Sequence, residues 1–196
     1  MNRTTVVYSP HPDDETLYLA GYITTMAARG HRLVLVAVED GGSSAVRPPG
    51  WSQEDVENVR VMEQTAAWGA LTRGQAEIHR LRTPDATSAD GSVRAMAQGL
   101  ERSYAGRVEH YVAGNYSTTQ SSLHQAVANG VRGAGVAVAR FSLPPGESGG
   151  WTYSPPADRV PDCELAWEIY RAFGHLSVGP LFALLRSSGF RSQIIT

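Results

Sequence analysis

Length, composition and charge place the chain among globular proteins. Its 196 residues suit one domain, 42% of them are hydrophobic, and 20 Gly with 11 Pro indicate many turns. The formal charge of −2 comes without a basic block, which argues against nucleic-acid binding through the phosphates. The single cysteine, Cys163, excludes an internal disulfide, and the chain has neither an apolar signal sequence nor an apolar run of about 18 residues. We therefore expect a cytoplasmic protein of one domain, residues 1–196, that does not enter membranes.

Apolar runs alternate with helical patterns along the chain. The runs predict strands at 5–8, 33–38, 77–82, 107–113 and 135–141. Helices are expected from about residue 15 to the Arg29-Gly30 pair, over 53–70 and 90–104, and from about residue 123. A Pro/Gly-rich loop follows at about 142–161, with two last helices at 163–173 and 179–188. This order predicts an α/β protein with a mostly parallel sheet covered by helices.

Residues 9 to 17 read Ser-Pro-His-Pro-Asp-Asp-Glu-Thr-Leu and directly follow the first strand. Sheets of this class place their chemistry at the carboxyl ends of strands. A catalytic zinc needs about three N, O or S ligands and an open position for water, and His11 and Asp14 suit two of them. Asp13 should point differently, so we expect it to act as the general base. The alternative, that both aspartates only cap a helix, accounts for one Asp and not for the whole run.

The run His11-Pro12-Asp13-Asp14-Glu15 after an N-terminal strand resembles the signature of the PIG-L/LmbE-like N-acetylglucosaminyl deacetylases. The resemblance implies a Rossmann-like three-layer fold, with helices on both faces of the sheet, and a zinc amidase that removes acetyl groups from amino sugars. It assigns His11 and Asp14 to the metal and Asp13 to the proton, and it calls for a distant histidine as third ligand. Zinc is the expected cofactor, with another divalent metal as the alternative.

His124 is the histidine best placed to be the third ligand. It follows the fourth predicted strand by a loop and lies in the first turn of a helix, so it should reach the same edge of the sheet as the motif. The alternative is a surface imidazole near a helix start. The remaining histidines precede, begin or lie inside strands, or end a late helix: His31, His110, His79 and His175.

The segment Ser121-Ser122-Leu123-His124 is similar to the family's His-Pro-Asp-His segment and departs from it. The resemblance implies that the zinc ligand is kept, while Ser121 replaces the histidine that stabilises the tetrahedral oxyanion. Losing one such donor costs about 10² to 10³ in rate. Either a hydroxyl or a backbone N–H takes over this role, or another residue does, with Tyr116 and His175 as candidates. The departure leaves the substrate class open.

Arg60 and Glu63 are similar to the family's Arg-x-x-Glu helix after the second strand. Their spacing of three residues places both on one helix surface, where they pair or where Arg60 reaches a polar substrate. We predict Arg60 and Ser121 as substrate-binding residues. The segments 41–44 and 84–85 also resemble family loops that flank the metal.

Two aromatic residues, Trp151 and Tyr153, lie in the predicted loop at 142–161. Aromatic rings pack against the apolar faces of sugars, and they equally anchor a loop to its own domain or to another subunit. The sequence favours anchoring over sugar stacking.

These predictions point to a zinc-dependent hydrolase that removes an N-acetyl or other N-acyl group from an amino sugar or related small molecule. Two other classes stay open: a zinc amidase with a non-sugar substrate, and a metal-retaining binding protein that has lost catalysis. A nucleotide-binding Rossmann protein is disfavoured because the first turn offers His-Pro-Asp-Asp instead of glycines. The expected partner is a small N-acetylated molecule, and self-association into a homo-oligomer stays open.

Overall fold

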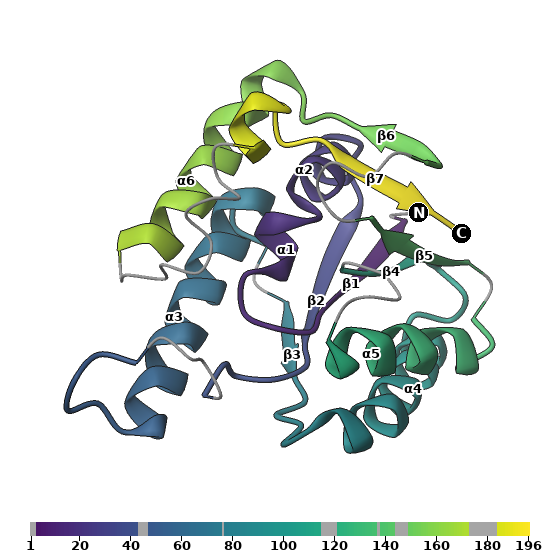
Figure 1. The fold of residues 1–196 in the computed structure, drawn as a ribbon. Coiled ribbons are helices and arrows are strands. Elements are labelled where there is room, and N and C mark those ends of the chain that lie inside the picture. Colours follow the sequence, from purple (N-terminus) through teal and green to yellow (C-terminus); the bar gives the residue numbers. More distant parts are fainter. Residues whose placement is uncertain are drawn as a thin grey trace.

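The centre of the molecule is a seven-stranded sheet in the order β3-β2-β1-β4-β5-β7-β6 (Figure 1). The computed structural model describes residues 3–42, 47–75, 77–114, 121–136, 138–143, 149–172 and 184–196. The strands are β1 Thr4–Ser9, β2 Arg32–Ala37, β3 Ile78–Arg80, β4 Val108–Ala113, β5 Ala139–Ser142, β6 Trp151–Tyr153 and β7 Ser192–Ile195. Strands β1 to β5 run parallel, whereas β7 is antiparallel to β5 and β6. The predicted α/β fold with a mostly parallel sheet is confirmed.

Helices cover both faces of this sheet (Figure 1). They are α1 Asp14–Leu17, α2 Ala20–Ala28, α3 Gln53–Thr72, α4 Ala86–Ser103, α5 Ser122–Gly133 and α6 Val160–Ala172, with a 3₁₀ helix, η1, at Ala157–Arg159. Helices α3 and α6 pack together over one face with α1 and α2, and α4 and α5 pack together over the other. Among the described helices, none is long and apolar enough to cross a membrane.

Successive side chains of β1 enter two different cores. Val7 belongs to the core under α2, α3 and α6, whereas Val6 and Tyr8 belong to the core under α4 and α5. A strand with both faces buried needs an uninterrupted apolar run, because neighbouring side chains point to opposite faces. The same holds for β2, which is buried from Leu33 to its end at Ala37. This explains why the sequence predicts these two central strands well.

Several helices begin or end away from their predicted positions. The first helix is interrupted at residues 18–19, so α1 and α2 are separate. Helix α4 begins at Ala86 rather than Asp90, because the Asp85 side chain accepts a hydrogen bond from the Ser88 N–H (2.9 Å) and caps it earlier. Helix α6 begins at Val160 rather than Cys163. Of the last predicted helix, residues 184–187 are helical and 179–183 lie outside the described residues.

The prediction of a loop over about 142–161 is wrong in part. Strand β6 and the helix η1 lie inside it, and β7 follows later at a place with no predicted strand. Both strands are short, so their sequence has no long apolar alternation, and pairing with distant partners gives them their conformation. Tyr153 packs on Tyr22 with ring centroids 4.8 Å apart, and its hydroxyl accepts a hydrogen bond from Arg140 (3.1 Å). These contacts support the anchoring role of this segment.

The sheet brings the loops of interest to one edge. Tyr8 near the end of β1 pairs with Val36 of β2 and with Ala113 of β4 in parallel register. The segments that follow these strands therefore leave the sheet side by side, at its carboxyl edge. The motif after β1 and the start of α5 after β4 meet there.

Candidate metal centre

The carboxylate of Asp14 lies between two imidazoles. Its Oδ2 atom is 2.9 Å from Nε2 of His124 and 3.3 Å from Nδ1 of His11, and it accepts a 2.8 Å hydrogen bond from the His11 backbone N–H. One ligand atom from each of the three side chains lies within 4.8 Å of the others. Asp14 and His124 are buried, whereas the side chain of His11 is 32% exposed. The structure thus brings together the three residues that were predicted as metal ligands.

The turn after β1 sets the positions of these groups. The Ser9 hydroxyl at the end of β1 donates to the His11 carbonyl (2.6 Å), and the Asp13 carbonyl accepts from the N–H groups of Thr16 and Leu17 (2.9 and 2.8 Å). Asp14 is consequently the first residue of α1, with its side chain at the carboxyl edge of the sheet. His124 lies in the first turn of α5.

Asp13 has an unusual backbone conformation. Its φ of 138° lies in a region that residues with a side chain rarely adopt, and holding such a residue there costs of order 1–3 kcal/mol. The residue is 8% exposed, at the N-cap of α1. Strain of this kind persists where the surrounding structure imposes it, and it is concentrated at functional sites.

The electrostatics of the centre favour positive charge. Burial opposes the charged form of His11, but the hydrogen bond and charge of Asp14, with Glu39 and Asp13, outweigh it and raise the pKa of His11 to about 9. Burial also opposes charge on Asp14, yet the neighbouring His124 and His11 hold the pKa of this carboxyl well below its usual range. A group of carboxylates that stabilises a cation in this way also suits a divalent metal ion.

Ser121, one of the two predicted substrate-binding residues, contacts the second nitrogen of His124. Its Oγ lies 2.9 Å from Nδ1 of the imidazole, while Nε2 faces Asp14. A hydrogen bond of this kind fixes the orientation of a ligating imidazole. Tyr116 and His175, the other oxyanion candidates, lie outside the described residues.

The Ser121 contact leads to a testable expectation. We expect Ser121→Ala to lower the affinity for zinc by about 10- to 100-fold, because the imidazole of His124 loses the partner that orients it. Competition with a chromophoric chelator measures this affinity. Ser122→Ala, which removes the neighbouring exposed hydroxyl, is the matched control. Equal zinc affinities of the two variants would contradict a positioning role for Ser121.

Arg60, the other predicted substrate-binding residue, forms an internal ion pair. Its Nη1 lies 2.5 Å from Oε2 of Glu63, and both residues are buried. The Gly41 backbone passes close to the same side chain: with φ of 80°, a Cβ at Gly41 would lie 3.0 Å from Cγ of Arg60. Arg60 thus supports the segment that follows β2, and its contact with substrate remains a prediction. Of the loop predicted at 41–44, residues 43 and 44 lie outside the described residues.

Glu15, the last residue of the motif, is tied to two helices that the sequence does not connect with it. Its buried carboxylate accepts hydrogen bonds from Gln64 of α3 (3.2 Å) and from Tyr170 of α6 (2.6 Å), and it lies 2.9 Å from the Ser9 hydroxyl. Burial raises the pKa of Glu15, and these donors partly compensate for the lost hydration. The sequence does not predict Gln64 and Tyr170 as part of the site. The only signal for them is that a buried carboxylate needs hydrogen-bond donors, which does not say where in the chain they lie.

A known protein family matches the part of the chain that carries this site. The family model PIG-L, described as GlcNAc-PI de-N-acetylase, matches residues 6–134, more than half of the chain. This chain belongs to the PIG-L family. The matched part contains both the motif at His11 to Glu15 and the distant His124, and the resemblance predicted from the motif is confirmed. Tyr170 lies beyond it.

Solved structures share the fold at low sequence identity. The zinc-inhibited form of teicoplanin deacetylase Orf2 is similar with a TM-score of 0.73 at 17% identity, over 97% of this chain and 96% of that chain. The N,N'-diacetylchitobiose deacetylase from Pyrococcus horikoshii gives a TM-score of 0.67 at 11% identity, over 98% and 83%. GalB, the 4-carboxy-2-hydroxymuconate hydratase from Pseudomonas putida, gives 0.68 at 14%, over 98% and 95%. No curated protein matches the chain significantly.

Proposed function

We propose that this protein is a metal-dependent hydrolase that removes the N-acetyl, or another N-acyl, group from an amino sugar or a related small molecule. The observation that carries the proposal is the meeting of His11, Asp14 and His124 beside Asp13 at the carboxyl edge of the sheet. Family membership supports it, because the description of the family names a de-N-acetylase. The similar deacetylase structures add that this fold accommodates the reaction.

The three side chains fit a zinc ion. Two imidazoles and one carboxylate, with ligand atoms within 4.8 Å of one another, are the donor set of a catalytic zinc with an open position, and other divalent metals accept the same ligands. When bound, the metal polarises the amide carbonyl and lowers the pKa of a water molecule from about 15.7 toward about 7. The partly exposed His11 and the buried Asp14 and His124 would hold the metal.

Asp13 would move the proton. As the water oxygen bonds to the carbonyl carbon, the Asp13 carboxylate takes the proton that the water loses. The C–N bond then breaks, and Asp13 returns the proton to the departing amine nitrogen. The products are acetate, or another carboxylate, and the free amine. His124, held by Ser121, would keep its place through these steps.

One observation favours a second candidate. Ser121 stands where the family has the histidine that stabilises the oxyanion, and its hydroxyl contacts His124. A zinc amidase for a non-sugar substrate, or a metal-retaining binding protein with weak or lost catalysis, is compatible with this change. The fold itself does not decide, since the hydratase GalB has it too.

Amine release from a panel of N-acetylated compounds tests the proposal. We expect the zinc-loaded protein to release free amine and acetate in equal amounts from N-acetylated amino sugars. Release only from N-acyl compounds that are not sugars would support the non-sugar amidase. Release from none of the compounds would overturn the proposed hydrolase and leave the binding protein.

A further inference from the structure

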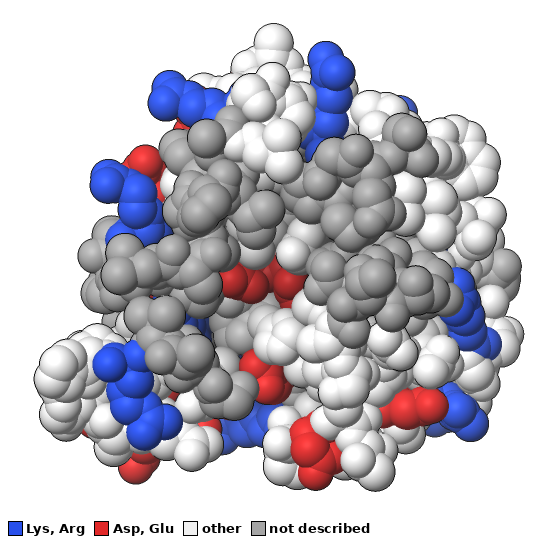
Figure 2. Space-filling view, in the orientation of Figure 1, with Lys and Arg blue, Asp and Glu red and all other residues white. Residues whose placement is uncertain are grey.

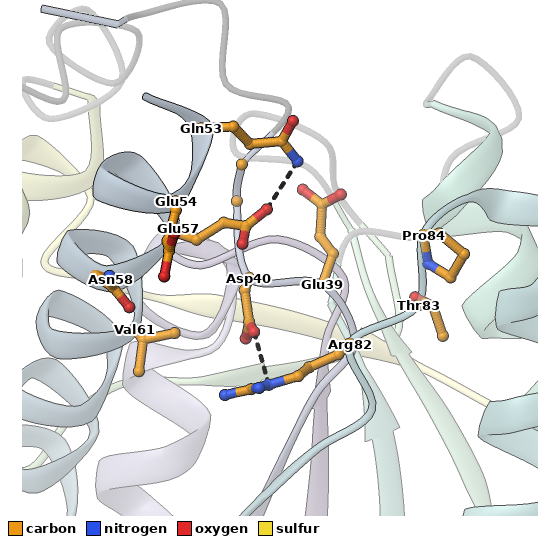
Figure 3. Close-up of a pocket in the computed structure, with 12 residues that line it drawn as sticks. Glu39, Asp40, Gln53, Glu54, Glu57, Asn58, Val61, Arg82, Thr83 and Pro84 are labelled. Atoms are coloured by element: carbon orange, nitrogen blue, oxygen red, sulfur yellow. Dashed lines mark hydrogen bonds and ion pairs between the residues drawn. The ribbon is translucent and has the colours of Figure 1, made fainter. Parts of the chain in front are cut away.

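A cavity of about 420 Å³ lies beside the metal centre, and nothing in the mechanism above uses it. Its walls come from three elements: the segment after β2, the first turns of α3 and the segment after β3 (Figure 3). Most of the residues that line it are polar: Glu39, Asp40, Gln53, Glu54, Glu57, Asn58, Arg82 and Thr83. Figure 2, in the orientation of Figure 1, shows Asp and Glu residues in a hollow on this face of the molecule.

Glu39 joins the cavity to the metal centre. It lines the cavity wall, and its Oε1 atom lies 3.8 Å from Nε2 of His11. A substrate whose N-acyl group lies at the metal centre would therefore place its next group against Glu39 and in the cavity. The volume of the cavity is in the range of small-molecule sites, which are commonly about 300–1,000 Å³.

The walls carry more negative than positive charge. Four carboxylates line the cavity, with Arg82 as the single cationic side chain among the described residues there. Arg82 is 3.0 Å from Asp40, which Arg80 also approaches at 3.5 Å, so this carboxylate is compensated within the protein. Glu54 lies in the first turn of α3, where the helix dipole stabilises a carboxylate without any ligand.

Glu39 and Glu57 are the carboxylates that a ligand would meet. Figure 3 shows both side chains projecting into the same space, Glu39 from the end of β2 and Glu57 from α3. Glu57 accepts a 2.8 Å hydrogen bond from the uncharged amide of Gln53. The Gly42 backbone lies so close to the Glu57 carboxylate that a Cβ at this position would clash with it.

We infer that this cavity binds the part of the substrate next to the N-acyl group, and that it selects a cationic, hydroxyl-bearing group, such as a free amino sugar, over an anionic one. The inference rests on the proposed function for the placement of the N-acyl group. Carboxylates accept hydrogen bonds from hydroxyls and attract an ammonium, whereas they repel a phosphate or carboxylate.

Three glycosides of N-acetylglucosamine that differ only in charge test the inference: 2-aminoethyl (cationic), 2-hydroxyethyl (neutral) and carboxymethyl (anionic). Calorimetry with zinc-loaded Asp13→Asn protein at low ionic strength measures binding without consuming the ligand. We expect the cationic glycoside to bind about tenfold or more tightly than the anionic one, with the neutral one between them. Equal affinities, the reverse order or no measurable binding would overturn the inference.

Substitutions in the cavity wall test whether the difference in affinity between the glycosides arises in the cavity. On the same background, Glu57→Gln and Glu39→Gln should each reduce the ratio between the cationic and the anionic ligand several-fold. Glu168→Gln removes the same charge from α6, outside the cavity, and should leave the ratio unchanged. A ratio that neither cavity variant changes would contradict the inference. If the charge order is found but the wild-type protein releases no amine from any of the glycosides, the deacetylase proposal fails and the cavity inference stands.

Discussion

Replacing Asp13 by Asn is expected to slow amine release by about 10²- to 10⁴-fold while the protein still binds zinc. The amide keeps the size and the strained backbone position of Asp13, whose φ is 138°, but it cannot take a proton from water. The predicted ligands His11, Asp14 and His124 are unchanged. Steady-state amine release and the zinc content of the same sample measure the two quantities together.

Asp90→Asn is the matched control for this result. Asp90 lies on α4, where it pairs with Arg94 at 2.9 Å far along the chain from the motif. The control should keep both wild-type turnover and zinc content. An Asp13→Asn protein as active as the control would contradict the assignment of the proton to Asp13, and loss of zinc in this variant would assign Asp13 to the metal instead.

Replacing His124 by Ala should weaken zinc binding by more than about 100-fold and remove activity with it. Loss of the hydrogen-bond partner of a metal ligand lowers the affinity for the metal by about 10- to 100-fold. Loss of the ligand itself should lower this affinity further. The substitution also leaves the buried carboxylate of Asp14 without its 2.9 Å neighbour. Zinc affinity by chelator competition, together with amine release at saturating zinc, measures the effect.

His79→Ala provides the comparison for His124. His79 lies in β3, and its side chain is 37% exposed. Its Nε2 atom lies 3.3 Å from Oε1 of Glu77. This variant should bind zinc as the wild-type protein does. If His124→Ala retained wild-type zinc affinity, the third ligand would be another residue and the distant half of the site would be wrongly assigned.

The motif and its placement could be predicted from sequence because each depends on neighbours in the chain. The buried strand β1 requires a continuous apolar run, and the residues after it must lie at the carboxyl edge. His124 could be found since parallel strands send their following loops to the same edge. The structure brings this histidine within 2.9 Å of Asp14, across 110 residues of sequence.

Other parts of the site depend on contacts that no local pattern encodes. The partners of Glu15, Gln64 on α3 and Tyr170 on α6, come from helices whose sequence shows only ordinary amphipathic spacing. The positive φ of Asp13 has no signal in the sequence, because residues with a side chain rarely adopt this conformation. The strands β6 and β7 are short, and they form because β7 pairs with β5 on one side and with β6 on the other. The cavity likewise needs three separate segments to meet.

The most direct measurement is amine release by metal-free protein as zinc is added back. We expect no release from an N-acetylated amino sugar in the metal-free state. Release should then rise linearly with added zinc to a plateau at one zinc per chain, because His11, Asp14 and His124 form a single centre. The Asp13→Asn protein should take up the same zinc and stay inactive. Metal-free protein that releases amine as fast as the reconstituted protein would contradict metal-dependent hydrolysis at this centre.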